Sequence, residues 1–339
     1  MHDQTRPRSR RRPAAPEPLL RALDDGADDA LLRQALAHAH YRPVARAAEL
    51  AAEGLYYALE GALRDAFRRF AARDHKHDPG CIAKGALARA LVALDCLDAG
   101  FYREGIALRQ PEPVWGGSVD TAADVRASCA MGLAASGAPD ALLDLVDLLS
   151  DPEHRARIGA VRAIGCTQPL AAAAVLRTKA LLGDVEPEVV GECFRALLAL
   201  DADDSPRFIA RWLEVVPGAD AVLAELAALA LGESRLDAAV ALLRARWETE
   251  PLRRPADRVL LRAAAMARSP AAFDWLLGLA AEADAATAAW VIEELAPYRH
   301  HRRLADDLRA RLAERGDADL LAAVATRFGG ADAGREQAP

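Results

Sequence analysis

The sequence has few aromatic residues, almost no β-branched runs and no apolar stretch long enough to cross a membrane. Phe, Trp and Tyr together make up 5% of the 339 residues. Strands are enriched in aromatic and β-branched side chains, so a large sheet is excluded as the main architecture. A membrane-spanning helix needs about 20 consecutive apolar residues, and no apolar core of a secretory signal follows the basic N-terminus. We therefore expect a helical protein of the cytoplasm with no membrane partner.

Cysteine pairs are also missing. The five cysteines are Cys81, Cys96, Cys129, Cys166 and Cys193. They form no CxxC motif, and each lies within or beside an apolar helical pattern. An odd number of separated cysteines in a chain of this size predicts buried thiols in a reducing compartment rather than a disulfide framework.

Positive charge is in deficit over most of the chain. The net charge is −7, although the first sixteen residues carry five arginines against one aspartate. A duplex-DNA binder needs a basic stripe against the phosphates, so the charge disfavours nucleic acid as a partner without excluding a local basic patch. Residues 1–17 hold too little apolar surface to offset chain entropy, which predicts a disordered basic tail, and residues 329–339 predict a second disordered tail.

What the sequence does contain is a repeated pair of helices. An apolar position near the end of the first helix of each pair recurs at steps of 29 to 37 residues. These positions are Leu133, Ile164, Leu197, Leu229, Met266 and Leu295. Self-similarity at this spacing is typical of a solenoid, in which each unit buries its faces on its neighbours. We expect an all-α fold: a right-handed α-solenoid over residues 74–328, preceded by an off-pattern helical N-terminal cap over residues 18–73.

The clearest repeat is 151-DPEHRARIGAVRAIG-165, where Asp-Pro is expected to begin a helix. A cation precedes the recurring apolar position by seven residues at Lys84, Arg126 and Arg157. This pattern resembles the HEAT-repeat family, and in particular its short bacterial repeats of the PBS-lyase type. The resemblance covers about residues 78–300 and implies the solenoid, but no activity. Armadillo and TPR solenoids are the nearest alternatives, and the TPR period with its aromatic and glycine positions is not met.

An inserted loop interrupts the repeat period. About eleven extra residues separate two of the cationic positions, and we place them in a loop over residues 107–120. Pro111 and Pro113 favour extended backbone there, and Gly116 and Gly117 permit a turn with positive φ. Long ordered loops in compact repeats are often functional.

The loop has two interpretations. In the structural one, Trp115 fills the groove between two repeats, and Glu112 pairs with Arg126 or Lys84. In the functional one, the same four side chains line part of the concave face and hold a partner. The residues expected to bind a partner are Lys84, Glu112, Trp115, Gly116, Gly117, Asp120, Arg126 and Arg157.

A second polar cluster, 74-DHKHD-78, places two histidines between carboxylates. Such a cluster could ligate a divalent metal, but a solvated turn in which Asp78 caps the next helix is favoured, and no metal site is predicted. Asp120 or Thr121 is likewise expected to cap the helix that follows the inserted loop.

No pattern in the sequence predicts catalysis or a cofactor. GxSxG, HExxH, P-loop and GxGxxG motifs are absent from their required context. By analogy with other solenoids, we expect a monomeric scaffold or adaptor that holds another protein on its concave face. One alternative is an enzyme resembling the HEAT-like DNA glycosylases, with Trp115 and Asp120 acting in a groove lined by Arg126, Arg157 and Arg162. The other is a lyase-type factor that attaches a chromophore or cofactor.

Overall fold

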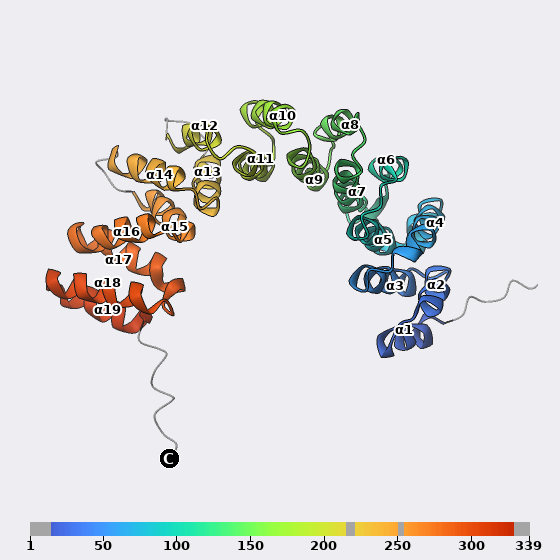
Figure 1. Ribbon diagram of the computed structural model, residues 1–339, viewed down its shortest axis with the longest axis horizontal. Coiled ribbons are helices and arrows are strands. Elements are labelled where there is room, and N and C mark those ends of the chain that lie inside the picture. The colour runs from blue at the N-terminus through green and yellow to red at the C-terminus, as the bar shows by residue number, and fades with distance from the viewer. Residues whose placement is uncertain (1–14, 215–220, 250–253, 329–339) are drawn as a thin grey trace, which may run out of the picture. The chain divides into compact units, whose positions relative to one another are not determined.

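The structure is a computed structural model that describes residues 15–214, 221–249 and 254–328. Over these residues the fold is all-α, with helices α1 to α19, short 3-10 turns and one two-stranded hairpin (Figure 1). The chain divides into two compact units, residues 1–172 and 173–339. The predicted disordered tails lie outside the described residues, except at residues 15–17, where Pro16 already begins α1.

The first unit is a two-layer stack of helices. Its elements are α1 (Pro16–Asp25), α2 (Asp29–Leu36), α3 (Tyr41–Glu53), α4 (Glu60–Ala71), α5 (Ile82–Ala93), α6 (Ala99–Ile106), β1 (Pro111–Val114), β2 (Gly117–Asp120), α7 (Ala123–Ala135), α8 (Ala141–Leu148) and α9 (His154–Gly165). Helices α3, α5, α7 and α9 pack in succession, while α2 packs on α4 and α6 on α8 in the other layer. The predicted cap is helical, and through α3 it joins the same layer as the later repeats.

The second unit repeats this arrangement. Its helices are α10 (Pro169–Leu182, which begins in the first unit), α11 (Pro187–Leu200), α12 (Ser205–Ala210), α13 (Ala221–Glu233), α14 (Asp237–Thr249), α15 (Arg258–Ala267), α16 (Pro270–Glu282), α17 (Ala285–Leu295), α18 (Arg302–Arg315) and α19 (Ala318–Phe328). Odd-numbered helices from α11 to α19 pack in one succession, and even-numbered helices from α12 to α18 in another. Consecutive packing of this kind is that of a solenoid.

Some helices begin with a side-chain cap, and others begin without one. Asp28 and Asp98 accept N–H groups from the first turns of α2 and α6, and α11 begins with Pro187 in its first turn. The expectation for the Asp151-Pro152 pair was wrong by two residues, since α9 begins at His154. Asp151 instead accepts the N–H of Glu153 and holds the turn that leads into the helix.

Most residues at the recurring apolar position belong to the core of their unit. Leu133, Ile164, Leu197 and Leu295 are fully buried, but Leu229 and Met266 are only partly buried. In α13 and α15 the core is filled by Leu231 and Leu261 instead. These two helices meet at Gly232, where a Cβ would lie 2.2 Å from the Ala263 carbonyl oxygen, so their buried faces are set by a backbone contact that the repeat pattern does not encode.

The thiols are free, but they are not all buried. Four of the five cysteines are buried, whereas Cys166 is exposed because it lies in the turn directly after α9. Within the described ranges, no helix combines the length and apolar character needed to cross a bilayer.

Candidate functional site

The inserted loop is a β-hairpin between α6 and α7. Its strands pair antiparallel, with Pro111 opposite Asp120 and Val114 opposite Gly117, so Trp115 and Gly116 form a two-residue turn. Gly116 has φ of +87°, the left-handed conformation expected for this glycine pair. The expectation of extended backbone at the two prolines is also met, since both lie in β1.

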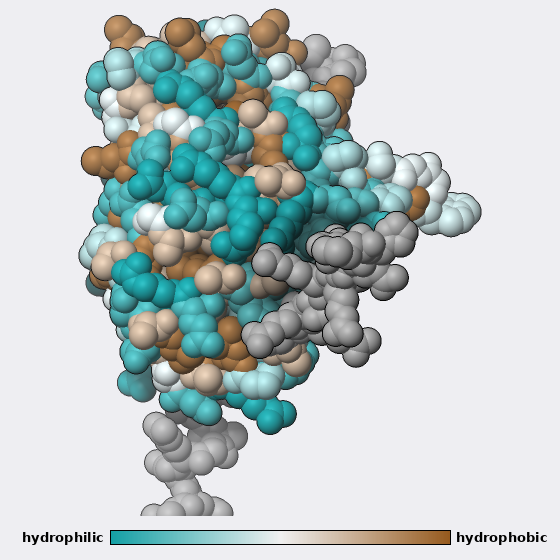
Figure 2. All heavy atoms as spheres, turned by 90° about the vertical axis from the view of Figure 1, so that its right-hand side faces the viewer, coloured by the Kyte–Doolittle hydropathy of each residue, from teal (hydrophilic) through white to brown (hydrophobic). Residues whose placement is uncertain are grey.

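The tip of the hairpin exposes an aromatic side chain. Trp115 is 100% exposed, with Val114 at 49% and Val119 at 47% beside it. The interpretation of Trp115 as a plug between repeats was therefore wrong, because the two strands carry the turn away from the helices. Figure 2 shows that the face at the right-hand side of Figure 1 is mostly hydrophilic, with apolar residues in small groups.

Glu112 anchors the first strand. Its Oε1 accepts hydrogen bonds from the Gly80 N–H at 2.6 Å, the Thr121 hydroxyl at 2.7 Å and the Gln110 side-chain amide at 2.8 Å. Burial acts to raise the pKa of Glu112, but the hydrogen bonds from Thr121, Gln110 and Gly80 outweigh it, and the pKa is lowered. The predicted ion pair of Glu112 with Arg126 or Lys84 was wrong, because both cations pair with aspartates instead.

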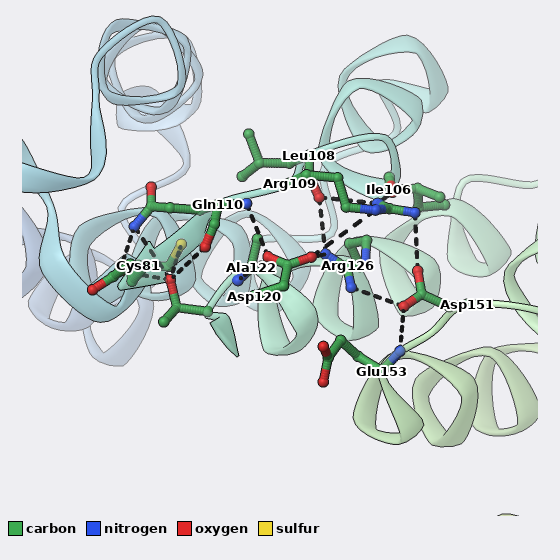
Figure 3. Close-up of polar contacts among 12 residues, drawn as sticks. Cys81, Ile106, Leu108, Arg109, Gln110, Asp120, Ala122, Arg126, Asp151 and Glu153 are labelled. Atoms are coloured by element: carbon green, nitrogen blue, oxygen red, sulfur yellow. Dashed lines mark hydrogen bonds and ion pairs between the residues drawn. The ribbon is translucent and has the colours of Figure 1, made fainter. Parts of the chain in front are cut away.

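Asp120 anchors the second strand. It accepts the backbone N–H groups of Gln110 at 2.8 Å and Ala122 at 3.0 Å, and it pairs with Arg126 at 2.7 Å (Figure 3). Burial acts to raise the pKa of Asp120, but these hydrogen bonds and the arginine lower it. Neither Asp120 nor Thr121 is the cap of α7, whose N-cap residue is Ala122 and has no side-chain bond. The Asp120 oxygens are taken instead by the N–H groups of Gln110 and Ala122 and by Arg126.

Arg126 joins the hairpin to the next repeat. Its fully buried guanidinium donates to the Leu108 carbonyl at 3.0 Å and to Asp151 at 2.8 Å, in addition to Asp120. Figure 3 shows Arg109 converging on Asp151 from the end of α6, at 3.0 Å. The carboxylates of two successive turns therefore share the two arginines.

Lys84 and Arg157 occupy equivalent places in their repeats. Lys84 is fully buried, with Nζ 2.9 Å from the equally buried Asp78. Arg157 is buried and donates to the carbonyls of Asp151 at 2.7 Å and Pro152 at 3.0 Å. The expectation that these cations and Arg126 contact a partner was wrong. Each cation lies six residues after an aspartate, in the helix that begins between them. Its side chain therefore reaches back to hold the turn before that helix.

The histidine cluster is a turn. His77 Nδ1 lies 2.8 Å from Asp74, while Asp78 accepts the N–H groups of Ala83 and Lys84 at 2.8 and 3.0 Å. Asp78 thus serves the start of α5 as expected, from a buried position. Across the described part of the chain, no three His, Cys, Asp or Glu side chains gather as metal ligands.

The eight residues predicted to bind a partner therefore fall into separate groups. Trp115, Gly116 and Gly117 form the exposed tip, and Glu112 and Asp120 lie at the hairpin base. The three cations are buried in successive helices of one layer: Lys84 in α5, Arg126 in α7 and Arg157 in α9. Gln110 was missed, although its side chain links Glu112 to the Asp78 carbonyl at 2.9 Å. A hairpin with its turn at residues 115–116 would have revealed it, since that register places Gln110 opposite Thr121.

No family model and no curated protein matches the sequence. Among solved structures, the chain is similar to an engineered protein crystallised by the Northeast Structural Genomics Consortium. The identity is 16% and the TM-score 0.35, over 93% of this chain and 90% of that one. Similarity at this level supports no inference about function.

Proposed function

We propose that this protein is a scaffold or adaptor that binds another protein through the tip of the β1–β2 hairpin. The observation that carries the proposal is Trp115, a large aromatic side chain held fully in solvent. Tryptophan is enriched among the residues that dominate binding energy at protein interfaces. Its ring buries much apolar area on contact, while its indole N–H remains available for a hydrogen bond.

The hydrogen bonds at the hairpin base hold the tip in place before any partner binds. Glu112 and Asp120 together accept five hydrogen bonds from neutral groups, and Asp120 also pairs with Arg126 and Arg109. A side chain carried on a fixed element loses less conformational entropy on binding than one carried on a free loop. The HEAT-like repeat pattern agrees with this role, since such solenoids commonly present binding surfaces.

The alternatives gain no support from the site. A phosphate-binding groove would need free cations, but Arg126 and Arg157 are buried and already bonded within the repeats. Asp120, cast as a catalytic carboxylate in the glycosylase alternative, accepts two N–H groups and an arginine. The proposal places the protein in the cytoplasm, where its free thiols would remain reduced.

Site-specific photo-crosslinking tests the proposal. A benzoylphenylalanine at position 115 should yield a discrete cross-linked protein in a native lysate, and excess wild-type protein should compete it away. The matched control carries the same group at Leu143, an exposed apolar position of the same unit at 70% exposure. Trp115→Ala protein should fail to compete. Identical products at the two positions, or equal competition by Trp115→Ala, would refute the proposal.

A further inference from the structure

The two outer edges of the hairpin differ in the backbone hydrogen-bonding groups that they present to solvent. Antiparallel strands alternate between hydrogen-bonded and non-hydrogen-bonded pairs. The Thr121 N–H donates to the Gln110 carbonyl at 3.0 Å, which fixes that pair as hydrogen-bonded. By alternation, the pairs Pro111–Asp120 and Pro113–Ser118 are not hydrogen-bonded, so their backbone groups point outward, away from the partner strand.

The outer edge of β1 is closed to strand pairing. Both of its outward positions, 111 and 113, are proline and have no N–H to donate. Proline on an exposed edge is a common device against pairing with another chain. This edge therefore offers carbonyl groups alone.

The outer edge of β2 is open. Its outward positions are Ser118 and Asp120, each with an N–H, and Ser118 is exposed. Among the residues that the structure describes, none accepts a hydrogen bond from either N–H. An extended segment laid along β2 would find a donor, an acceptor and a second donor at strand spacing, which is the pattern that strand addition requires.

The side chains on one face of the hairpin determine which side chains of such a segment would fit. Alternation places Val114 and Val119 on the same face as Glu112, and both valines are about half exposed. The charge of Asp120 is paired with Arg126, whereas Glu112 accepts only neutral donors and keeps its negative charge on this face, which disfavours an acidic segment. The surface therefore favours a segment without acidic residues that carries β-branched or aromatic residues at alternate positions.

We infer that the partner binds as a third strand along β2, as an extended segment of another protein that lacks acidic residues and whose alternate apolar side chains cover Val114 and Val119. Trp115 then lies at the end of the new strand pair, where it contacts the partner's side chains. This inference rests on the proposed function and names the form that the partner takes.

The test uses linear peptides displayed on phage and selected on the full-length protein. Ser118→Pro removes the outward N–H and leaves the β1–β2 ladder intact, because that N–H takes no part in it, and the preceding Gly117 tolerates the restriction that proline imposes. Ser118→Ala is the matched control, since it keeps the N–H. A selected peptide should bind Ser118→Ala like wild type and Ser118→Pro about tenfold more weakly. The Ser118 amide should also become protected from hydrogen exchange in the complex.

Two controls keep the outcome decisive. Exchange of the Gly80 amide, which donates to Glu112, reports whether the hairpin base of each variant is intact. Equal peptide binding by Ser118→Pro and Ser118→Ala, failure to select any extended peptide, or a dimer of the protein that Ser118→Pro abolishes would each overturn the inference. If cross-linking at position 115 succeeds while Ser118→Pro has no effect, the proposed function stands and strand addition fails. If cross-linking itself fails, the proposed function falls.

Discussion

Individual charged residues in the first unit act as internal braces. Three cations follow an aspartate by six residues, and each reaches back to the turn before its own helix. Burying a charge costs far more than it gains unless the charge is paired and hydrogen-bonded. Arg126 meets that condition through Asp120 and Asp151, and Lys84 is paired with Asp78 at 2.9 Å.

Removing one member of a buried pair should be far more costly than removing an exposed one. Arg126→Met leaves Asp120 and Asp151 with only the half-exposed Arg109 as a shared partner and should destabilise the first unit by about 3–5 kcal/mol. Arg155→Met, which breaks an ion pair with Asp124 that is about two thirds exposed, should cost at most about 1 kcal/mol. Urea unfolding followed by circular dichroism measures both. Equal shifts in the unfolding midpoint would contradict a bracing role for Arg126.

The hairpin anchor should be sensitive to acid. The folded protein holds the pKa of Glu112 below its ordinary value, so the unfolded chain takes up a proton first as the pH falls. The stabilisation is complete above the ordinary pKa of about 4.3 and is lost as the pH falls through the lower folded value. Glu112→Gln cannot titrate, so its unfolding midpoint in urea should fall less steeply than that of wild type between about pH 5 and pH 3. Parallel pH profiles would show that the anchor does not depend on this carboxylate.

The hairpin turn and the contact between two helices each depend on a glycine, for different reasons. In the hairpin, Gly116 supplies a positive φ that other residues adopt only at a cost. Between α7 and α9, Gly159 supplies space, since a Cβ there would lie 2.4 Å from the Ala127 Cα. A substitution at either site therefore reports on backbone conformation in one case and on helix packing in the other.

The turn can be tested with its own neighbour as the control. A side chain at either Gly116 or Gly117 would meet open space, but only Gly116 has a positive φ. Gly116→Ala should weaken the hairpin by about 1–2 kcal/mol, seen as faster limited proteolysis between α6 and α7, while Gly117→Ala should leave the cleavage rate near that of wild type. Equal rates for the two variants would mean that the turn does not need its left-handed residue.

Replacing a helix glycine by alanine should destabilise the protein where the helix is tightly packed and stabilise it where the position is open. Gly159→Ala should destabilise the first unit by about 1–3 kcal/mol, because the methyl group meets the backbone of α7. Gly278→Ala, in the middle of α16 with nothing within 4 Å, should stabilise the second unit by about 1 kcal/mol through propensity alone. Thermal unfolding of each variant decides the matter, and a stabilised Gly159→Ala would show that α7 and α9 do not approach this closely.

At the scale of the whole chain, stacked helices replace a single core. A chain of 339 residues exceeds the usual size of one hydrophobic core. Here each helix pair buries its apolar faces on the next, and each of the two compact units holds its own buried residues. In such an arrangement stability is close to a sum of local terms and neighbour terms.

Core truncations should therefore have local effects. Ile164→Ala in the first unit and Leu197→Ala in the second remove fully buried side chains and should each cost about 2–5 kcal/mol. Hydrogen exchange by mass spectrometry should show protection lost mainly in the unit that carries the substitution, in α7 and α9 for the first variant and α11 and α13 for the second. Uniform loss across both units would indicate one cooperative core, and unchanged stability would place these residues outside it.

The sequence by itself determined the helical class, the stacked helix pairs and most of their core. Leu133, Ile164 and Leu197 could be assigned because helix periodicity and repeat spacing are local properties of the chain. The irregular segment, its extended prolines and its positive-φ glycine were evident for the same reason. The register failed at Leu229 and Met266, where a close backbone contact rather than side-chain periodicity sets the buried face.

Only the tertiary structure decided which side chains of the candidate site face solvent. Lys84, Arg126 and Trp115 were expected to act together, yet both cations are buried and Trp115 is fully exposed. Burial of Arg126 depends on the end of α6 and the turn before α9, 18 and 25 residues away in the chain. Exposure of Trp115 depends on the strands that carry it beyond those contacts. Pairings between distant segments fix both properties, and a one-dimensional pattern does not contain them.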